Sequence, residues 1–191
     1  KLSEKEFKLY HIDQRINDRG ILVDKDLIDS AININNYYED ILKAKLKKLT
    51  NIDNIKSVVQ VKTYLNSNFN IELDSLNKAT IEKLIETTND EKLKEILNLR
   101  QELNKTSVKK YEAMKNTMCK DYRIRGLFQF YGANKTGRWS GRLVQVQNLP
   151  QNKVSINLPR SILKDNKDYK EAFELLDILY DNPKSILSQL I

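Results

Sequence analysis

Two long stretches of this chain carry apolar side chains at the spacing of an α-helix and contain no glycine or proline. The first runs from Asp26 to Leu49 and the second from Asn89 to Met118. At 1.5 Å per residue, the second stretch, about 30 residues long, would form a rod of roughly 45 Å. The pattern predicts two long helices that pair as an antiparallel stalk, with shorter helices at its tip.

The rest of the chain is predicted to be shorter helices and one small sheet. Gly20 suits a left-handed helix C-cap, and Asp24 and Ser57 suit helix N-caps. Short helices are predicted over residues 3–17, 57–65, 79–88, 171–180 and 184–191, strands over 126–132 and 143–146, and a polar connector over 160–170. The predicted fold class is therefore mainly α (α+β), with long antiparallel helices and a small antiparallel β-sheet.

The net charge of +7 is concentrated in one window of the sequence. Residues 120–160 hold eight basic side chains and one acidic side chain, Asp121, whereas residues 1–119 carry +2 and residues 161–191 carry −2. An acid-poor, basic window indicates a polyanionic partner.

Several classes of function lack their sequence signals. Cys119 and His11 are the single residues of their types, so the sequence predicts no disulfide, no Cys-cluster zinc site and no Ser-His-Asp triad. No phosphate-binding loop is visible, and no catalytic or metal-binding residue is predicted. No apolar run approaches the ~20 residues that span a bilayer, so we expect no membrane partner and a cytoplasmic location. The chain starts without an initiator Met and is expected to be a fragment.

The segment Thr136–Pro150 (TGRWSGRLVQVQNLP) lies inside the basic window. It contains two arginines and three amide side chains but no acid: Arg138, Arg142, Gln145, Gln147 and Asn148. Every base pair presents an acceptor, purine N3 or pyrimidine O2, in the minor groove, so such donors can contact DNA of any sequence. The alternative is that the three amides cap turns and satisfy strand edges.

Two interpretations are possible for several other side chains as well. Trp139 and Tyr131 could stack on bases, or they could anchor a small sheet on its helices. Arg100 and Lys105, together with Lys109 and Lys110, could follow phosphates along the second long helix. For Lys109 and Lys110 the alternative is a solvated helix face.

The 136–150 segment resembles the T-G-R-x-S…Q-N-x-P signature of family A (DNA polymerase I-like) DNA polymerases, in a phage-type version. The matching positions, without a gap, are Thr136, Gly137, Arg138, Ser140, Gln147, Asn148 and Pro150. Val144 and Gln145 depart from the Pro and Asn that the family usually has there.

Further segments extend the resemblance over nearly the whole chain. Residues 13–24 resemble the helix and turn that lead into the polymerase domain, and residues 99–111 resemble the long thumb helix, with Arg100 and Ser107 at family positions. Residues 54–60 resemble a thumb-tip element, although Val59 replaces its usual lysine. The last nineteen residues resemble the approach to the first catalytic carboxylate motif of the palm.

The resemblance implies a role for each motif residue. Thr136, Arg138 and Arg142, with Gln145, Gln147 and Asn148, would bind the primer–template near the primer terminus. Asn54, Ser57, Arg100 and Lys105 would hold the duplex backbone from the thumb. Residues 1–23 would form the leading helix and turn on the palm side, 24–119 the helical thumb, and 120–191 a partial palm that ends before the catalytic aspartates.

The expected parent is a phage DNA-directed DNA polymerase, a nucleotidyltransferase of DNA replication. It would extend a primer with dNTPs using Mg²⁺, whereas this chain alone is expected to bind primer–template DNA without polymerising and to hold no cofactor. Two alternatives remain open from the residues: a stand-alone, non-catalytic DNA- or RNA-binding module, and a helical interaction module whose basic patch meets an acidic protein.

Overall fold

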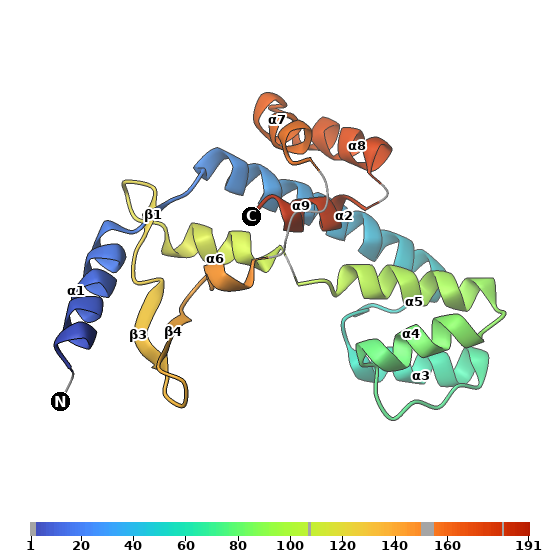
Figure 1. Cartoon of the computed structure of the whole chain (residues 1–191). Helices are drawn as coiled ribbons and strands as arrows, with labels where there is room; N and C mark the ends of the chain where they lie inside the picture. The colour runs from blue at the N-terminus through green and yellow to red at the C-terminus, as the bar shows by residue number, and fades with distance from the viewer. Residues whose placement is uncertain (1–2, 107, 150–154, 181) are drawn as a thin grey trace. The chain divides into compact units, whose positions relative to one another are not determined.

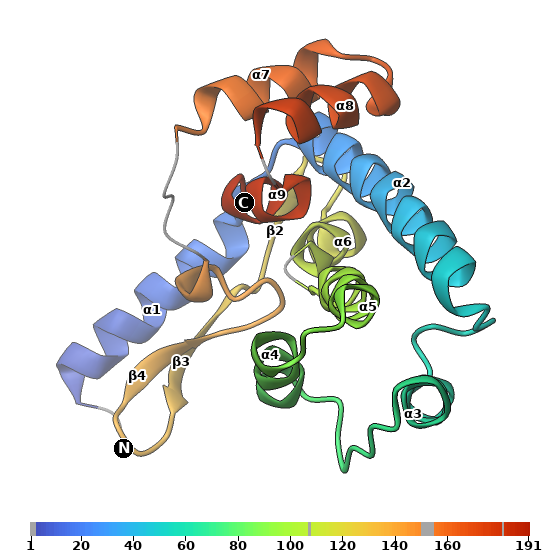
Figure 2. The same ribbon diagram turned by 90° about the vertical axis from the view of Figure 1, so that its right-hand side faces the viewer.

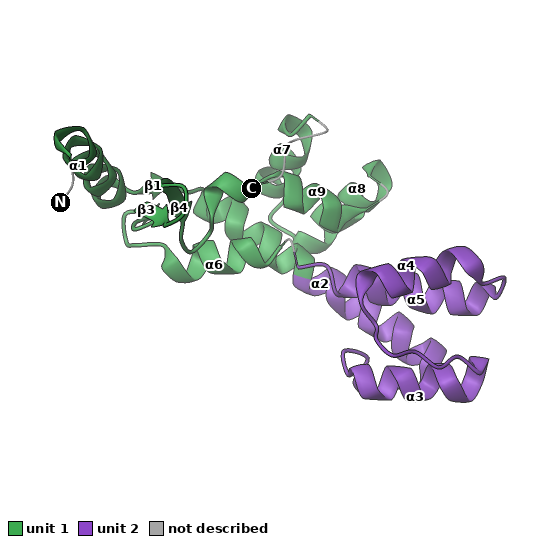
Figure 3. Ribbon diagram, turned by 60° about the horizontal axis from the view of Figure 1, so that its bottom comes forward, with its two compact units in different colours: residues 1–35, 107–191 green, residues 36–106 purple. Residues whose placement is uncertain are grey.

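The computed structural model describes residues 3–106, 108–149, 155–180 and 182–191. The chain divides into two compact units, which Figure 3 colours separately. Unit 1 comprises Lys1–Asn35 and Ser107–Ile191, and unit 2 comprises Asn36–Thr106. Over the described residues the fold is mainly helical with two small antiparallel sheets, which confirms the predicted fold class.

The elements follow one another along the chain as Figure 1 shows. The helices are α1 (Glu4–Arg19), α2 (Lys25–Thr50), α3 (Val58–Phe69), α4 (Lys78–Thr87), α5 (Glu91–Leu103), α6 (Lys109–Thr117), α7 (Asn157–Asp165), α8 (Tyr169–Leu179), α9 (Pro183–Gln189) and a 3₁₀ turn, η1 (Val146–Asn148). The strands are β1 (Ile21–Leu22), β2 (Arg123–Ile124), β3 (Phe128–Ala133) and β4 (Arg138–Gly141).

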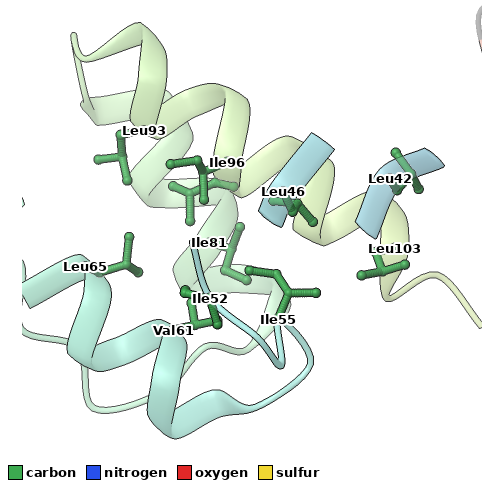
Figure 4. Packing of buried hydrophobic residues seen from close by; sticks show 11 residues of the cluster. Leu42, Leu46, Ile52, Ile55, Val61, Leu65, Ile81, Leu93, Ile96 and Leu103 are labelled. Carbon is green, nitrogen blue, oxygen red and sulfur yellow. The ribbon is translucent and has the colours of Figure 1, made fainter. Parts of the chain in front are cut away.

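Unit 2 is a helical unit around an aliphatic core. The second half of α2 contributes Leu42 and Leu46, and α5 contributes Leu93, Ile96 and Leu97 at helical spacing. Figure 4 shows Leu46, Leu93 and Ile96 gathered with side chains from α3, α4 and the loop before α3, and Leu42 beside Leu103 of α5. Side-chain caps fix the helix starts: Ser57, Asn77 and Asp90 each accept a hydrogen bond from a backbone N–H of the first turn.

The prediction of one continuous helix over residues 89–118 is wrong. The structure has α5 and α6 instead, with α5 ending at Leu103 and α6 beginning at Lys109. Asn104 closes α5 through its backbone N–H, which donates to the Arg100 carbonyl at 3.1 Å. The intervening NKTSV segment is rich in side chains that compete for backbone hydrogen bonds or crowd the preceding turn. The apolar spacing continues through this segment, but its residues have low intrinsic helix propensity, and the helix ends there.

In unit 1, α1 packs beside β3, as both Figure 1 and Figure 2 show. The joint is a reciprocal pair of hydrogen bonds from Asn17 to the backbone of Phe128: Asn17 Nδ2 donates to the Phe128 carbonyl at 2.9 Å, and Asn17 Oδ1 accepts from the Phe128 N–H at 3.0 Å. This pairing uses both the donor and the acceptor of the Asn17 side chain, and it fixes the position of α1 along β3.

Gly20 ends α1 with a positive φ of 67°, but its ψ of 175° is not that of the predicted left-handed helical cap. A Cβ at this position would lie 2.7 Å from the carbonyl oxygen of Ile124. Glycine is therefore required both by the backbone conformation and by the close approach of the β1–β2 ladder, in which Ile21 pairs with Ile124.

The strand predicted over residues 126–132 is present as β3, whereas the strand predicted over 143–146 is wrong. The partner of β3 is β4, immediately after a four-residue turn. Leu143 and Gln145 have left-handed φ values of 56° and 51°, which a continuous strand does not accommodate. Residues 142–149 therefore form a compact loop containing η1.

The polar connector predicted over residues 160–170 is also wrong, because α7 occupies most of it. Pro159, Ile162 and Leu163 are buried on one face of α7, which packs against α8. The Asn182–Pro183 pair starts α9 as a capped first turn. No helix among the described residues is long and apolar enough to cross a membrane.

Candidate nucleic-acid interface

The centre of the candidate interface is the β3–β4 hairpin of unit 1. Phe128 pairs with Gly141, Gln129 with Ser140 and Ala133 with Arg138, with an irregularity between the last two pairs. The turn is closed by the backbone N–H groups of Thr136 and Gly137, which donate to the Ala133 carbonyl at 3.0 and 2.9 Å. Thr136 is exposed at the tip of this turn.

Alternation along the strands separates the hairpin into two faces. Arg138 and Ser140 lie on one side of β4, together with Gln129, the partner of Ser140 on β3. Arg142 joins this face because its Nε donates to Gln129 Oε1 at 3.0 Å. We call Gln129, Arg138 and Arg142 the polar face. The Arg138 side chain is exposed and makes no hydrogen bond or ion pair with any residue that the structure describes, so its donors are available to a ligand.

In the loop after β4, apolar side chains that point inward are interspersed with polar side chains that point outward. Val144, Val146 and Leu149 line an apolar cavity of about 220 Å³ with Tyr111, Met114 and Leu127. Val144 is 2% exposed, and it anchors the loop in unit 1. The residues between these anchors, Gln145, Gln147 and Asn148, are exposed. Anchoring alternate apolar residues holds the amide side chains outward, which accounts for the VQVQNL pattern.

The three amides have structural contacts as well as exposure. Asn148 Nδ2 donates to Gln145 Oε1 at 3.0 Å, and the Asn148 backbone N–H donates to the Gln145 carbonyl at 2.9 Å. Lys110 Nζ donates to the Asn148 carbonyl at 2.8 Å. Gln147 occupies the space above Gly141, where a Cβ would lie 2.1 Å from its Oε1. Turn capping therefore uses one hydrogen of the Asn148 amide and the side-chain oxygen of Gln145. The other amide groups of the three side chains remain exposed.

The single acidic side chain of the basic window is already paired. Arg125 donates to Asp121 through Nη1 and Nη2, at 2.9 and 2.6 Å, and this pairing lowers the pKa of the Asp121 carboxyl to about 2. Arg125 Nε also donates to the Asp18 carbonyl at 2.8 Å. Because Asp121 is neutralised by its neighbour, the positive charges of Lys135, Arg138 and Arg142 stay uncompensated on the hairpin.

Four of the residues predicted to bind DNA lie in unit 2, and two of them build a local turn. Asn54 Oδ1 accepts from the Lys56 N–H at 3.1 Å, and the Ser57 Oγ accepts from the Gln60 N–H at 3.4 Å as the N-cap of α3. Gln60 Oε1 accepts from the Asn54 N–H at 3.0 Å. Structural hydrogen bonds thus explain why Asn, Ser and Gln occur at this spacing.

The other two differ in exposure. Arg100 is 3% exposed, burial lowers the pKa of its guanidinium, and its Nε has no hydrogen-bond partner among the described residues. Lys105 is more exposed, and its Nζ lies 2.5 Å from Glu102 Oε2. Arg100 is therefore not presented to solvent in this structure, whereas Lys105 is. Ser107, also at a family position, lies outside the described residues.

The sequence did not predict the structural roles of three residues that shape the interface, one of which, Lys110, is interpreted from the sequence only as a phosphate contact or as part of a solvated helix face. Gln129 orients Arg142, Asn17 docks α1 on β3, and Lys110 holds the η1 turn. A signal for Gln129 exists in the sequence, since a polar residue between Phe128 and Phe130 marks the opposite face of a strand. The contacts of Asn17 and Lys110 are long-range and have no local signal.

No group of His, Cys, Asp and Glu side chains that could hold a metal ion occurs in the part of the chain that the structure describes. The hairpin and the loop after it offer binding groups: two permanent cations, exposed amides and no acidic side chain.

A comparison with curated proteins finds similarity to a DNA polymerase of Bacillus phage SP02. The two are 49% identical over 189 residues, which cover 98% of this chain and 28% of the phage protein. The chain thus spans less than a third of the length of that relative. No protein-family model matches the chain, and no solved structure matches it.

Proposed function

We propose that this chain is part of a phage DNA-directed DNA polymerase of family A and that its β3–β4 hairpin and 142–149 loop bind primer–template DNA. The observation that carries the proposal is the 49% identity to a phage DNA polymerase along 98% of the chain. The exposed, acid-free hairpin supports it, because it supplies hydrogen-bond donors and positive charge to a polyanion.

Arg138 is the main donor in this proposal. Its guanidinium is permanently charged, carries five N–H groups and is free of internal partners among the described residues. It can therefore donate to the acceptors that all base pairs present in the minor groove without first breaking an ion pair. Arg142, oriented by Gln129, would add a contact on the same face, and the exposed amides of the loop would contact the DNA beside the hairpin, Gln147 from the side of β4 that carries Trp139 and Gly141.

In the proposed assignment, residues 1–23 lead into the polymerase domain, 24–119 form the thumb and 120–191 belong to the palm. Asn54, Ser57 and Lys105 would approach the duplex backbone from the thumb. Arg100 would need to leave its buried environment to do so, since 3% of it is exposed. Two Mg²⁺ ions and dNTPs would be bound by other residues of the parent polymerase, in the cytoplasm of the infected cell.

Binding of primer–template duplex at several salt concentrations tests this function. A fluorescein-labelled duplex, titrated with the 191-residue chain and followed by anisotropy, should bind with a log K against log salt slope of roughly −4 to −5, as four to six phosphate contacts predict. With Mg²⁺ and dNTPs present, the primer should remain unextended. An affinity that does not change with salt would contradict the proposal.

A further inference from the structure

The side of the hairpin opposite the polar face carries a cluster of aromatic rings shared with α1. Tyr10 of α1 meets Phe130 of β3 edge-on, with 5.9 Å between ring centroids, and Phe130 meets Trp139 of β4 at 6.5 Å. The cluster continues along α1 to His11 and Phe7, whose rings are 4.5 Å apart, and along β3 to Tyr131. We call these six rings, Phe7, Tyr10, His11, Phe130, Tyr131 and Trp139, the ring cluster.

Most of the ring cluster is open to solvent. Phe7 is 53% exposed, Tyr131 45%, Trp139 44% and Tyr10 38%. Phe130 is the half-buried ring that contacts both α1 and β4 and, with Asn17, performs the anchoring. Tyr10 is the ring of α1 in this joint, whereas the ring contacts of Phe7, Tyr131 and Trp139 stay within α1 or within the hairpin. These three rings are thus left exposed without joining the sheet to its helix, and large aromatic surfaces left in water mark a binding site.

The backbone is shaped to present Tyr131. This residue has a φ of 57°, a left-handed conformation that is uncommon for an aromatic residue. Its ring lies over Gly137, where a Cβ would approach ring atoms to 2.9 Å. Gly137 itself has a φ of 65°, so the turn needs glycine for its conformation and for the ring above it. Holding a tyrosine in a costly conformation at the surface indicates a use for the ring.

Two unpaired cations lie on the elements that carry these rings. Arg15 on α1 and Lys135 in the hairpin turn are exposed, and neither makes a side-chain hydrogen bond or ion pair with the described residues. On α1, Arg15 lies one turn beyond His11 on the same face. The acids of the first turn are engaged, Glu4 with Lys8 at 2.9 Å and Glu6 with the Ser3 N–H at 2.7 Å. The hairpin contains no acid.

We propose that the ring cluster is a stacking platform for single-stranded DNA, separate from the duplex-binding polar face. Free cations recognise phosphates, and ring faces recognise unpaired bases, which a duplex keeps stacked inside. Aromatic residues and arginine also suit a protein partner, but the unpaired cations and the absence of acids in the hairpin favour a polyanion. The inference rests on the proposed function for its choice of DNA as ligand. The opposite faces of one hairpin would then bind paired and unpaired segments of the same DNA.

Trp139 is the single tryptophan of the chain, so its fluorescence reports the platform directly. We expect a twelve-nucleotide oligo(dT) to quench this fluorescence on binding. A blunt twelve-base-pair duplex should bind with little quenching. A twelve-unit abasic deoxyribose-phosphate strand has the same backbone charge without bases, and it should neither quench nor bind as tightly as oligo(dT).

Variants separate stacking from folding, with binding followed by anisotropy of a labelled oligo(dT). Trp139→Leu and Tyr131→Leu should each weaken single-strand binding by about 5- to 100-fold, as the loss of one base–aromatic stack predicts. Duplex affinity should change less than twofold. Trp139→Phe and Tyr131→Phe keep a ring and should retain most of the affinity. Tyr169→Leu, a 40%-exposed tyrosine of α8 outside the cluster, is the matched control.

The outcomes are distinguishable. If the duplex binds but oligo(dT) leaves Trp139 fluorescence unchanged, the platform is refuted and the proposed function stands. If neither nucleic acid binds, the proposed function itself fails. Equal binding of the abasic strand, equal losses for duplex and single strand in the leucine variants, or self-association of the chain that Trp139→Leu abolishes would each overturn the stacking assignment.

Discussion

The two units use similar polar residues in different ways. In unit 2, Asn54, Ser57 and Gln60 form hydrogen bonds that build a turn and start α3. In the hairpin and loop of unit 1, buried Val144 and its apolar neighbours supply most of the anchoring. Gln145 and Asn148 bond to each other and stay exposed, and Arg138 is exposed with no partner among the described residues. Polar residues that support the backbone need no ligand to explain them. Arg138 supports no backbone group among the described residues, and a ligand would account for its position on the hairpin.

The largest expected effect is on the stability of unit 2. Leu97 is fully buried in its aliphatic core, so Leu97→Ala should reduce the free energy of unfolding by about 2–5 kcal/mol. Urea denaturation followed by circular dichroism measures the change. Val59→Ala, at a 73%-exposed position of α3, should change stability by less than about 0.5 kcal/mol. Equal losses in the two variants would show that unit 2 does not depend on this core.

Ser57 tests whether unit 2 uses its polar residues only for structure. Ser57→Ala removes the N-cap of α3 and should cost about 0.5–2 kcal/mol of stability, whereas Ser57→Asp keeps a capping acceptor. If Ser57 is only a cap, both variants bind duplex DNA like the parent under conditions where both are folded. A phosphate contact would instead make Ser57→Asp bind more weakly than Ser57→Ala, which would remove the contrast between the units.

Gly141 allows a test of whether the position of the Gln147 side chain matters for DNA binding. A methyl group there would lie 2.1 Å from Gln147 Oε1, so Gly141→Ala should displace this flexible side chain with little loss of stability. If the position of Gln147 matters for DNA, Gly141→Ala and Gln147→Ala should each weaken duplex binding, by about two- to tenfold for one lost hydrogen bond. The double variant should bind duplex DNA no more weakly than either single variant. Additive losses would show that the two residues act separately.

The smallest effect concerns Asp121, whose pKa Arg125 lowers to about 2. A carboxyl with a lowered folded-state pKa contributes stability that is complete above its unfolded pKa of roughly 4. This contribution is lost as pH falls from about 4 to 2. Because Asp121 is exposed, only a minor change in stability is expected. NMR titration of the carboxyl should give a midpoint near 2 that Arg125→Ala raises, and a midpoint near 4 in the parent would contradict the pairing.

Local signals predicted much of the fold. Apolar periodicity located α2, and the caps at Asp24 and Ser57 began helices as expected, with Asp24 Oδ1 accepting from the Leu27 N–H at 3.2 Å. Periodicity failed after Leu103, where apolar spacing continues through a segment of poor helix formers. It also failed at 143–146, where alternate apolar residues are buried by a loop with left-handed residues and not by a strand.

The site was predictable to a similar degree. The residue types of the 136–149 segment indicated exposed donors, and exposed donors are what the hairpin and loop present. The burial of Arg100 and the orienting contacts of Gln129 and Lys110 depend on residues far apart in the sequence, which periodicity and spacing do not encode. The ring cluster likewise joins α1 to a hairpin more than a hundred residues later.

If the hairpin binds duplex DNA through Arg138, the Arg138→Ala variant should lose affinity for primer–template duplex in an anisotropy titration while keeping its stability in urea. Losing a charged donor should weaken binding by about 10- to 100-fold. Stability should change by less than about 0.5 kcal/mol, because the side chain has no partner among the described residues. Arg19→Ala, at an exposed arginine ending α1, should bind within about threefold of the parent. Unchanged affinity of Arg138→Ala, or a loss explained by unfolding, would show that Arg138 is not a duplex-binding residue.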